Sequence, residues 1–374
     1  MAPKTSVSGL PKRKALRAYF LGMSLPAYIC QNFPHMRCFA LFLLGFSAFS
    51  AFSQNPNFTI LDLSLPAEIS YFDNQFSGLY IGEDKLFLMS ESRLQDKAEA
   101  KLYAFSLADL DHKIKDSSFI LPYKKYQIYN LDLLREKMKL KGDEYEGLEA
   151  IVINGNDVYL TVETVTSSPN CYLLKGHLNY TNVVMDPDLL MPLPKPVTRN
   201  GAHIYNAGYE AIGMFGGNLY TFFEYNSFPE DNYVKMISPG SLEKGGEYHS
   251  IFADKIPFRV TDITRTGANE FTGINYFYKG GGKDEIYRVP KNQSSADRLI
   301  RDSTGAYRSY CRLISITFTG MQFSWKTLWE FPDEYFSYNW EGIAAYNKGY
   351  FIINDKYTPA KPYVSKLLYF RNSQ

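Results

Sequence analysis

Short apolar stretches rich in β-forming residues, separated by polar or glycine-containing turns, recur along the chain from residue 58 onward. Four of them superimpose without a gap, with a closing acid 14 positions after the opening residue: SGLYIGEDKLFLMSE (77–91), EAIVINGNDVYLTVE (149–163), EAIGMFGGNLYTFFE (210–224) and EGIAAYNKGYFIIND (341–355). A fifth, degenerate copy fits at 262–276, with Asp262 opening and Tyr276 closing. Two short strands joined by a tight turn form a hairpin, so the repeat predicts five related hairpins.

The spacing of the copies predicts the fold. Intervals of 52 to 79 residues suit the blades of a β-propeller better than a β-sandwich. Further strand-like sequence follows the hairpins, at 101–107, 171–178, 233–238 and 311–319. The last copy is followed only by 365–370, and the stretch 58–65 can supply its missing outer strand. We therefore predict an all-β chain that forms a single propeller, five-bladed and closed by the N-terminal strand.

Two alternatives to a purely five-bladed β structure follow from the segments between the copies. A six-bladed ring results if 93–145 or 278–340 hides a divergent blade. Helix-forming composition is concentrated at 131–140, which predicts a short helical insertion between the first two blades.

The N-terminal segment has a different character from the repeats. Residues 1–53 contain six Lys or Arg and no acid, and the apolar run FALFLLGFSAFSAFS occupies 39–53. Small residues near its end are typical of a cleaved signal peptide, whereas 15 residues interrupted by three serines are too short to span a bilayer. We predict an upstream n-region at 1–35, a signal peptide at 36–53 cut near Ser53, and a propeller domain at 54–374 that is exported to the periplasm or the cell exterior.

The charge balance changes once the signal peptide is removed. The 374-residue chain has 40 Lys+Arg against 39 Asp+Glu, and without residues 1–53 the count becomes 34 against 39, a net charge of −5. A mildly acidic domain argues against nucleic-acid binding. We expect a monomer with no membrane span in the mature chain, whose partner is a small ligand or substrate.

The repeat gathers acidic residues at the propeller axis, because the first strand of each blade lines that axis. The opening residues, expected around one rim, are Ser77, Glu149, Glu210, Asp262 and Glu341. The closing acids, expected one strand further out, are Glu91, Glu163, Glu224 and Asp355. Converging carboxylates need protons or a cation, and an oxygen-only set favours Ca²⁺. Alternatively, the acids accept backbone N–H groups and link neighbouring blades, which we expect of the closing set.

The sequence also resembles a known family in its repeat strings. FSGL (76–79), YEGLEAI (145–151), YEAI (209–212), TDIT (261–264) and WEGI (340–343) resemble the phytase-like propellers, named for an esterase-like activity of phytase. A more distant resemblance is to the calcium-activated nucleotidases (apyrases), five-bladed propellers whose Ser and Glu residues hold an axial Ca²⁺. It implies metal ligation by Ser77, Glu149, Glu210 and Glu341, with Asp262 replacing a Ser. The nucleotidase strings GEW and HES are absent.

Two functions are compatible with this pattern. The first is a Ca²⁺-dependent hydrolase of a phosphate-bearing or other anionic ester, with three candidate residues at the substrate. His203 is a candidate acid or base, and Arg265 and Lys356 either contact the substrate anion or act as counter-ions to the acids. The second is a non-catalytic propeller that binds a ligand or partner around a structural cation. The glycine-rich string KGGGK (279–283) is either a phosphate cradle or a loop between strands, and its spacing favours the loop.

Overall fold

The computed structural model describes residues 57–93, 100–243, 246–289 and 295–373, all within a compact unit that spans Asn55–Gln374. The predicted n-region and signal peptide lie outside the described residues. In the ranges that are described, no helix is long and apolar enough to cross a membrane.

Strands dominate the described residues, and they form five four-stranded antiparallel runs in which each strand pairs with the next. The first two runs are β2 (Phe76–Gly82), β3 (Lys85–Ser90), β4 (Lys101–Ser106), β5 (Lys124–Tyr129) and β6 (Tyr145–Asn154), β7 (Asp157–Thr164), β8 (Asn170–Leu178), β9 (Asn182–Pro194). The next two are β10 (Ala211–Phe215), β11 (Asn218–Phe222), β12 (Asn232–Ile237), β13 (His249–Ala253) and β14 (Arg259–Arg265), β15 (Glu270–Phe277), β16 (Tyr310–Phe318), β17 (Gln322–Glu330). The fifth comprises β18 (Trp340–Tyr346), β19 (Gly349–Asn354), β20 (Leu367–Asn372) and β1 (Phe58–Leu63).

Helices occur only as short connections within the described residues. They are α2 (Ala67–Ser70), α3 (Leu107–Lys115), α4 (Leu131–Leu140), α5 (Pro239–Leu242) and α6 (Ser295–Leu299), with 3₁₀ turns η1 (Phe72–Asn74), η2 (Gly282–Tyr287) and η3 (Asp333–Tyr335). The helix predicted at 131–140 is confirmed as α4, which buries Leu131, Leu134 and Met138. The all-β prediction is likewise confirmed.

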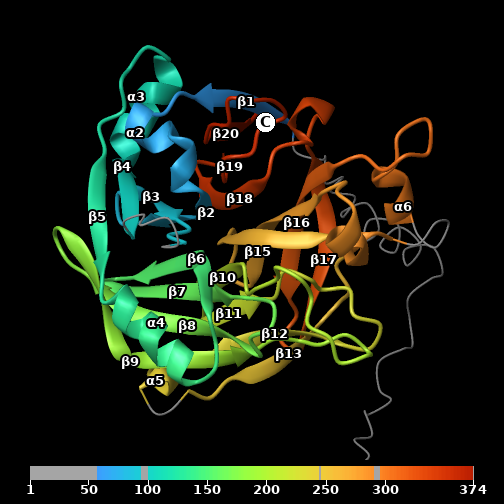
Figure 1. Ribbon diagram of the computed structural model, residues 1–374. Coiled ribbons are helices and arrows are strands. Elements are labelled where there is room, and N and C mark those ends of the chain that lie inside the picture. The colour runs from blue at the N-terminus through green and yellow to red at the C-terminus, as the bar shows by residue number, and fades with distance from the viewer. Residues whose placement is uncertain (1–56, 94–99, 244–245, 290–294, 374) are drawn as a thin grey trace, which may run out of the picture. The chain divides into compact units, whose positions relative to one another are not determined.

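The first strands of the runs pack against one another in cyclic order. β2 contacts β6, β6 contacts β10, β10 contacts β14, β14 contacts β18, and β18 returns to β2 (Figure 1). Four-stranded antiparallel runs set around such a cycle are the architecture of a β-propeller. The N-terminal strand completes the last run as predicted, because β1 pairs antiparallel with β20 from Phe58↔Asn372 to Leu63↔Leu367.

Hydrogen bonds join the runs in a way that the repeat did not predict. β5 pairs in parallel with β9, and β13 pairs in parallel with β17, so the runs form two eight-stranded sheets and one four-stranded sheet rather than five separate ones. The start of β9 pairs with β8 on one side and with β5 on the other, at Val183 for example. These pairs satisfy backbone groups that an isolated outer strand would leave open.

Aromatic side chains hold the fifth run against the fourth. Phe58 of β1 lies 5.3 Å from the ring of Trp329 in β17, and Trp329 lies 5.2 Å from Phe370 in β20. Phe58 and Phe370 are buried, and full burial of such a side chain stabilises a fold by about 2–3 kcal/mol. The joint at which the chain closes on itself is therefore an apolar one.

Candidate metal centre

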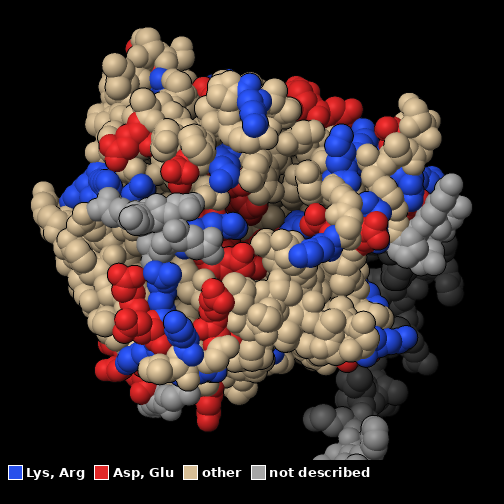
Figure 2. Space-filling model, in the orientation of Figure 1, with Lys and Arg blue, Asp and Glu red and all other residues tan. Residues whose placement is uncertain are grey.

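A cavity of about 800 Å³ opens where the first and second strands of the runs converge. Figure 2 shows acidic atoms inside a hollow on this face of the molecule. Seven carboxylates line it: Glu91, Glu149, Glu163, Glu210, Glu224, Glu341 and Asp355. Four basic side chains also line it: Arg93, Arg259, Lys279 and Lys356. The cavity therefore gathers most of the acids that the sequence placed at the axis.

The opening residues reach the cavity because the inner strands are bulged at their positions. Ser77 in β2, Glu149 in β6 and Glu341 in β18 each lie at a register shift against the neighbouring strand. A bulge leaves one residue unpaired and redirects its side chain. Glu210 directly precedes β10 and lines the same cavity. The gap-free sequence repeat thus corresponds to a β-bulge that recurs at the opening residue of β2, β6 and β18.

In the fourth run the bulge lies at Thr261, one residue before the predicted opening position. Thr261 Oγ1 donates to the carbonyl of Trp340 at 2.7 Å, just as Ser77 Oγ donates to the carbonyl of Leu148 at 2.6 Å. Thr261 rather than Asp262 is therefore the structural equivalent of Ser77.

Asp262 occupies a different environment from the other opening residues. Its carboxylate accepts N–H groups from Ile263 and Ile343 at 2.8 Å and from Leu79 at 3.4 Å, so it links β14 to β18 and β2. It is buried and is not among the residues that line the cavity. The predicted opening residue of the fourth copy is therefore one position late, at Asp262 instead of Thr261. The cause is the turn of this hairpin, which runs through residues 266–270, whereas the other four hairpins have two-residue turns.

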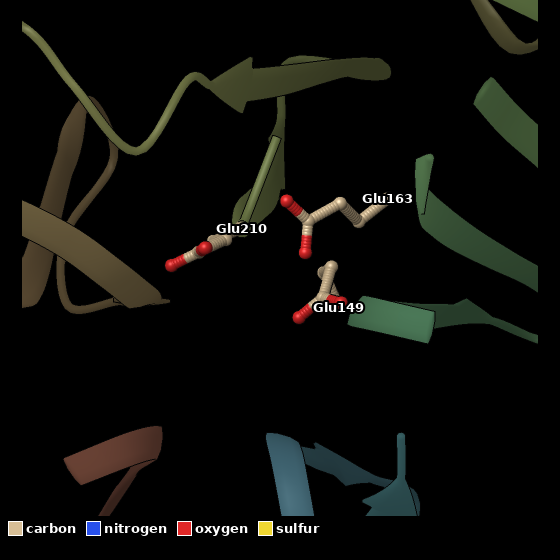
Figure 3. Close-up of side chains that lie close together, drawn as sticks. All are labelled: Glu149, Glu163 and Glu210. Atoms are coloured by element: carbon tan, nitrogen blue, oxygen red, sulfur yellow. The ribbon is translucent and has the colours of Figure 1, made fainter. Parts of the chain in front are cut away.

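Three glutamates approach one another more closely than the other acids. Glu149, Glu163 and Glu210, called the carboxylate trio below, each place one oxygen within 4.8 Å of the others, and each is at most 8% exposed. Figure 3 shows the three side chains close together, with one carboxylate oxygen of Glu163 directed toward Glu149 and with Glu210 beside them. The sequence assigned Glu163 to the outer, closing set, yet the structure brings it to the opening residues. Ser77 and Glu341 line the cavity outside the trio.

Two buried oxygens of the trio lack a hydrogen-bond donor among the described residues. Glu149 Oε1 and Glu163 Oε1 are buried and have no hydrogen-bond partner among the described residues. Burial, followed by repulsion from neighbouring carboxylates, raises the pKa of Glu149 and of Glu210 well above its ordinary value. The same causes raise the pKa of Glu163 to about 8. Without a cation, the trio therefore holds protons at neutral pH.

Glycine allows two acids to meet at this point. A Cβ atom on Gly147 would lie 2.8 Å from Glu91 Cγ and 3.1 Å from Glu149 Oε1. Contacts of 2.8 Å are too short for a real side chain, so a larger residue would displace one of the acids. The glycine in YEGLEAI therefore positions the trio without contributing a functional group.

The other closing acids have partners, and they are called the paired carboxylates below. Glu91 accepts a hydrogen bond from Arg93 Nε, and Glu224 accepts hydrogen bonds from Arg259 and from the Tyr287 hydroxyl. Asp355 accepts the Tyr357 N–H at 2.6 Å. Burial raises the pKa of Glu91 to about 7, although Arg93 opposes the shift.

Of the three substrate-contact candidates, only Lys356 lines the cavity. Arg265 is exposed and donates from Nε to the carbonyl of Gly267 at 2.9 Å, and half-buried His203 lies outside the lining. Sequence reasoning missed Arg93 and Arg259. Arg93 carries a local signal, because it lies two positions after a closing acid, whereas Arg259 reaches Glu224 only through the fold.

Fold and cavity together define a β-propeller with an acidic axial cavity. The sequence matches no protein-family model and no curated protein. Solved structures similar to it include the major allergen Mala s 1 of Malassezia sympodialis (11% identity, 83% of each chain covered, TM-score 0.43). Others are the catalytic domain of a GH62 α-L-arabinofuranosidase of Coprinopsis cinerea (13%, 85% of this chain and 98% of that chain, 0.44) and a GH32 β-fructofuranosidase of Bombyx mori (12%, 79% and 58%, 0.42). Likenesses at this level define no family and transfer no activity to the chain.

Proposed function

We propose that the chain is a five-bladed propeller with an axial Ca²⁺ site and that it hydrolyses a phosphate-bearing or other anionic ester there. Each four-stranded run is one blade. The cyclic contacts of the five inner strands and the closure of the last run by β1 support this count, although parallel pairing of outer strands merges the blades into three sheets.

The metal site rests on one observation above all. Two buried carboxylate oxygens, Glu149 Oε1 and Glu163 Oε1, have no described partner and belong to a trio whose oxygens lie within 4.8 Å of one another. Two ionised carboxylates at that separation repel by roughly 3 kcal/mol at an effective dielectric constant of about 20. A cation between them relieves this repulsion and satisfies both oxygens.

The chemistry of the lining favours Ca²⁺ over a softer metal. The described lining contains no His or Cys, and Ca²⁺ accepts irregular shells of carboxylate, hydroxyl and water oxygens. Glu149, Glu163 and Glu210 would hold the ion, and Ser77 and Glu341 would complete the set, directly or through water. Asp262 does not belong to this set, because its carboxylate already accepts three N–H groups.

The residues around the trio suit an anionic ester. A bound Ca²⁺ would polarise the ester oxygen and a water molecule. Lys356 lines the same cavity and supplies a positive charge for the substrate anion. Glu91 also lines it, lies outside the trio and is available to accept a proton from water. The lining of one cavity thus contains a candidate site for the cation, a group for the anion and a proton acceptor.

A non-catalytic binding propeller with a structural Ca²⁺ is the second candidate. It is favoured by the full engagement of the buried acid Glu224 with Arg259 and Tyr287, and by the location of His203 and Arg265 outside the cavity. Both candidates require the ion, and they differ only in turnover.

Thermal unfolding of the chain in EDTA and then in Ca²⁺ tests the metal. Ca²⁺ at about 100 times its dissociation constant adds about 2.7 kcal/mol to the free energy of unfolding, which raises Tm by several degrees. The double variant Glu149→Gln/Glu163→Gln should lose this response, and the exposed control Glu334→Gln should keep it. A Ca²⁺ response that survives in the double variant contradicts the site.

Turnover is tested separately with a panel of phosphate and carboxylic esters, each with and without Ca²⁺. Ca²⁺-dependent hydrolysis supports the first candidate. If the folded, Ca²⁺-bound protein leaves every ester intact, the binding function replaces it.

A further inference from the structure

Two exposed tyrosines, Tyr278 and Tyr357, line the cavity together with the acids. Tyr278 follows the closing residue Tyr276 by two positions, and Tyr357 follows the closing residue Asp355 by two positions. Their side chains are 49% and 46% exposed, although both line the cavity. They come from the fourth and fifth runs, whose inner strands β14 and β18 are neighbours. The repeat thus places two aromatic residues from adjacent runs in the lining of one cavity.

The glycine-rich string at 279–283 holds one of these rings in place. A Cβ atom on Gly280 would lie 2.3 Å from Tyr278 Cε1, so the ring packs directly over this backbone and only glycine fits. The carbonyl of Gly280 accepts Arg288 Nη2 at 3.0 Å, and the N–H of Lys279 donates to Ser309 Oγ at 3.3 Å. The string is therefore an anchored support for Tyr278.

The second ring is held by a different contact. Tyr357 packs edge-on against Tyr363, with ring centroids 5.2 Å apart, and Tyr363 also lines the cavity. Both tyrosines thus pack against a neighbour and remain partly exposed.

Two lysines outside any ion pair of the described residues accompany the rings, and the Lys356 ammonium lies 5.3 Å from the centroid of the Tyr357 ring. Lys279 and Lys356 line the cavity, and neither ammonium group forms an ion pair with a described carboxylate. Arg93 and Arg259, by contrast, are paired with Glu91 and Glu224. The rim next to the tyrosines is therefore the part of the lining that retains cations for a ligand.

We propose that the ligand of this cavity is an organic anion with a planar ring. The ring lies on Tyr278 and Tyr357, and the anionic group contacts Lys279 and Lys356 on its way to the trio. Tyrosine faces bind flat rings by stacking, and ammonium groups bind phosphate or carboxylate. The proposal rests on the proposed function in one respect, since the cation in the trio offsets the negative charge that would repel an anion.

Calorimetric titration of the full chain with three probes tests this ligand class in the presence and absence of Ca²⁺. Phenyl phosphate should bind at least tenfold more tightly than methyl phosphate, and benzyltrimethylammonium should bind more weakly than both. Tyr278→Ala and Tyr357→Ala should each weaken phenyl phosphate about tenfold and leave methyl phosphate unchanged. Lys279→Gln/Lys356→Gln should weaken both phosphates. Tyr233→Ala, an exposed tyrosine of β12 that does not line the cavity, is the control.

The outcomes separate this proposal from the proposed function. Equal affinity for the two phosphates, no binding of either, or tighter binding of the ammonium probe overturns the ring-bearing anion. Phenyl phosphate that binds through the tyrosines but is not hydrolysed contradicts only the reaction. The Ca²⁺-dependent rise in Tm is measured in the same samples. If this rise is absent while phenyl phosphate still binds through the tyrosines, the metal site alone is contradicted.

Discussion

The carboxylate trio (Glu149, Glu163 and Glu210) and the paired carboxylates (Glu91, Glu224 and Asp355) line the same cavity, but they differ in the hydrogen-bond donors that surround them. The trio has two buried oxygens that no described group satisfies. The paired carboxylates accept hydrogen bonds from arginine, tyrosine or backbone N–H groups. All of them are buried acids of the same repeat, so position in the repeat does not set their chemistry.

The donors around each acid make the difference. Asp262 shows the extreme case, because three backbone N–H groups surround its carboxylate and it links three inner strands. Hydrogen bonds to the charged form stabilise a buried carboxylate, and their absence leaves protons or a cation to do so. The comparison therefore predicts different responses to substitution. Changes at the paired carboxylates should lower the stability of the fold, whereas changes at the trio should alter its response to pH and Ca²⁺.

Removing a partner on the paired side should have the largest effect. Arg259→Met leaves Glu224 without its cation, and the Glu224 side chain is only 2% exposed. Breaking a buried pair from one side costs about 3–5 kcal/mol. Urea unfolding should show a loss of this size for the variant in EDTA and in Ca²⁺ alike.

The matched control lies on the same strand. Arg265 of β14 is exposed and donates to the carbonyl of Gly267, so Arg265→Met should change the free energy of unfolding by less than about 0.5 kcal/mol. A loss below about 1 kcal/mol for Arg259→Met would show that the paired side is not held by this ion pair.

Raising the pH should destabilise the metal-free protein, and this effect is expected to be the second largest. The pKa of Glu91 is raised to about 7 and that of Glu163 to about 8, both from an ordinary value of 4.5. Between pH 4.5 and each raised pKa, the native state holds a proton that the unfolded state has lost, so the free energy of unfolding falls as pH rises. The slope is up to about 1.4 kcal/mol per pH unit for each carboxyl.

Urea unfolding at pH 5, 6, 7 and 8 measures this slope. In EDTA the free energy of unfolding should fall over the series, and Glu163→Gln should flatten its upper part. Saturating Ca²⁺ should also reduce the slope, because the ion replaces the protons of the trio. Stability in EDTA that is constant or rises from pH 5 to pH 8 contradicts the raised pKa values.

The hairpins, the strand after each of them and the closing strand were predictable from sequence because their determinants are local, whereas the outer strands β5, β9, β13 and β17 were not predicted. Apolar runs and turns locate the hairpins, and the missing strand of the last copy points to residues 58–65, of which Phe58–Leu63 form β1. The parallel pairs β5 with β9 and β13 with β17 had no such signal. They depend on tertiary contacts between the outer strands of neighbouring runs, and such contacts leave no periodic pattern in the sequence.

The site was predictable only in part, for a related reason. The repeat places Glu91 and Glu163 in the same closing position, but Arg93 follows Glu91 by two residues, and Val165 follows Glu163. That difference was readable, and it separates a paired acid from a member of the trio. The partnership of Glu224 with Arg259 of the next run depends on tertiary packing and was not readable.

The smallest expected effect tests whether the trio acts through its geometry. Gly147→Ala keeps every carboxylate and adds one methyl group, which would lie 2.8 Å from Glu91 Cγ and 3.1 Å from Glu149 Oε1. Displacing a ligand in this way should weaken Ca²⁺ about tenfold, within the range for groups that orient metal ligands. Calorimetric Ca²⁺ titration measures the change. Gly240→Ala is the control, because no atom lies within 4 Å of its Cβ position. An unchanged affinity in Gly147→Ala would mean that Glu149 is not placed by this contact, whereas a selective loss shows that the unpaired side depends on how closely its acids converge.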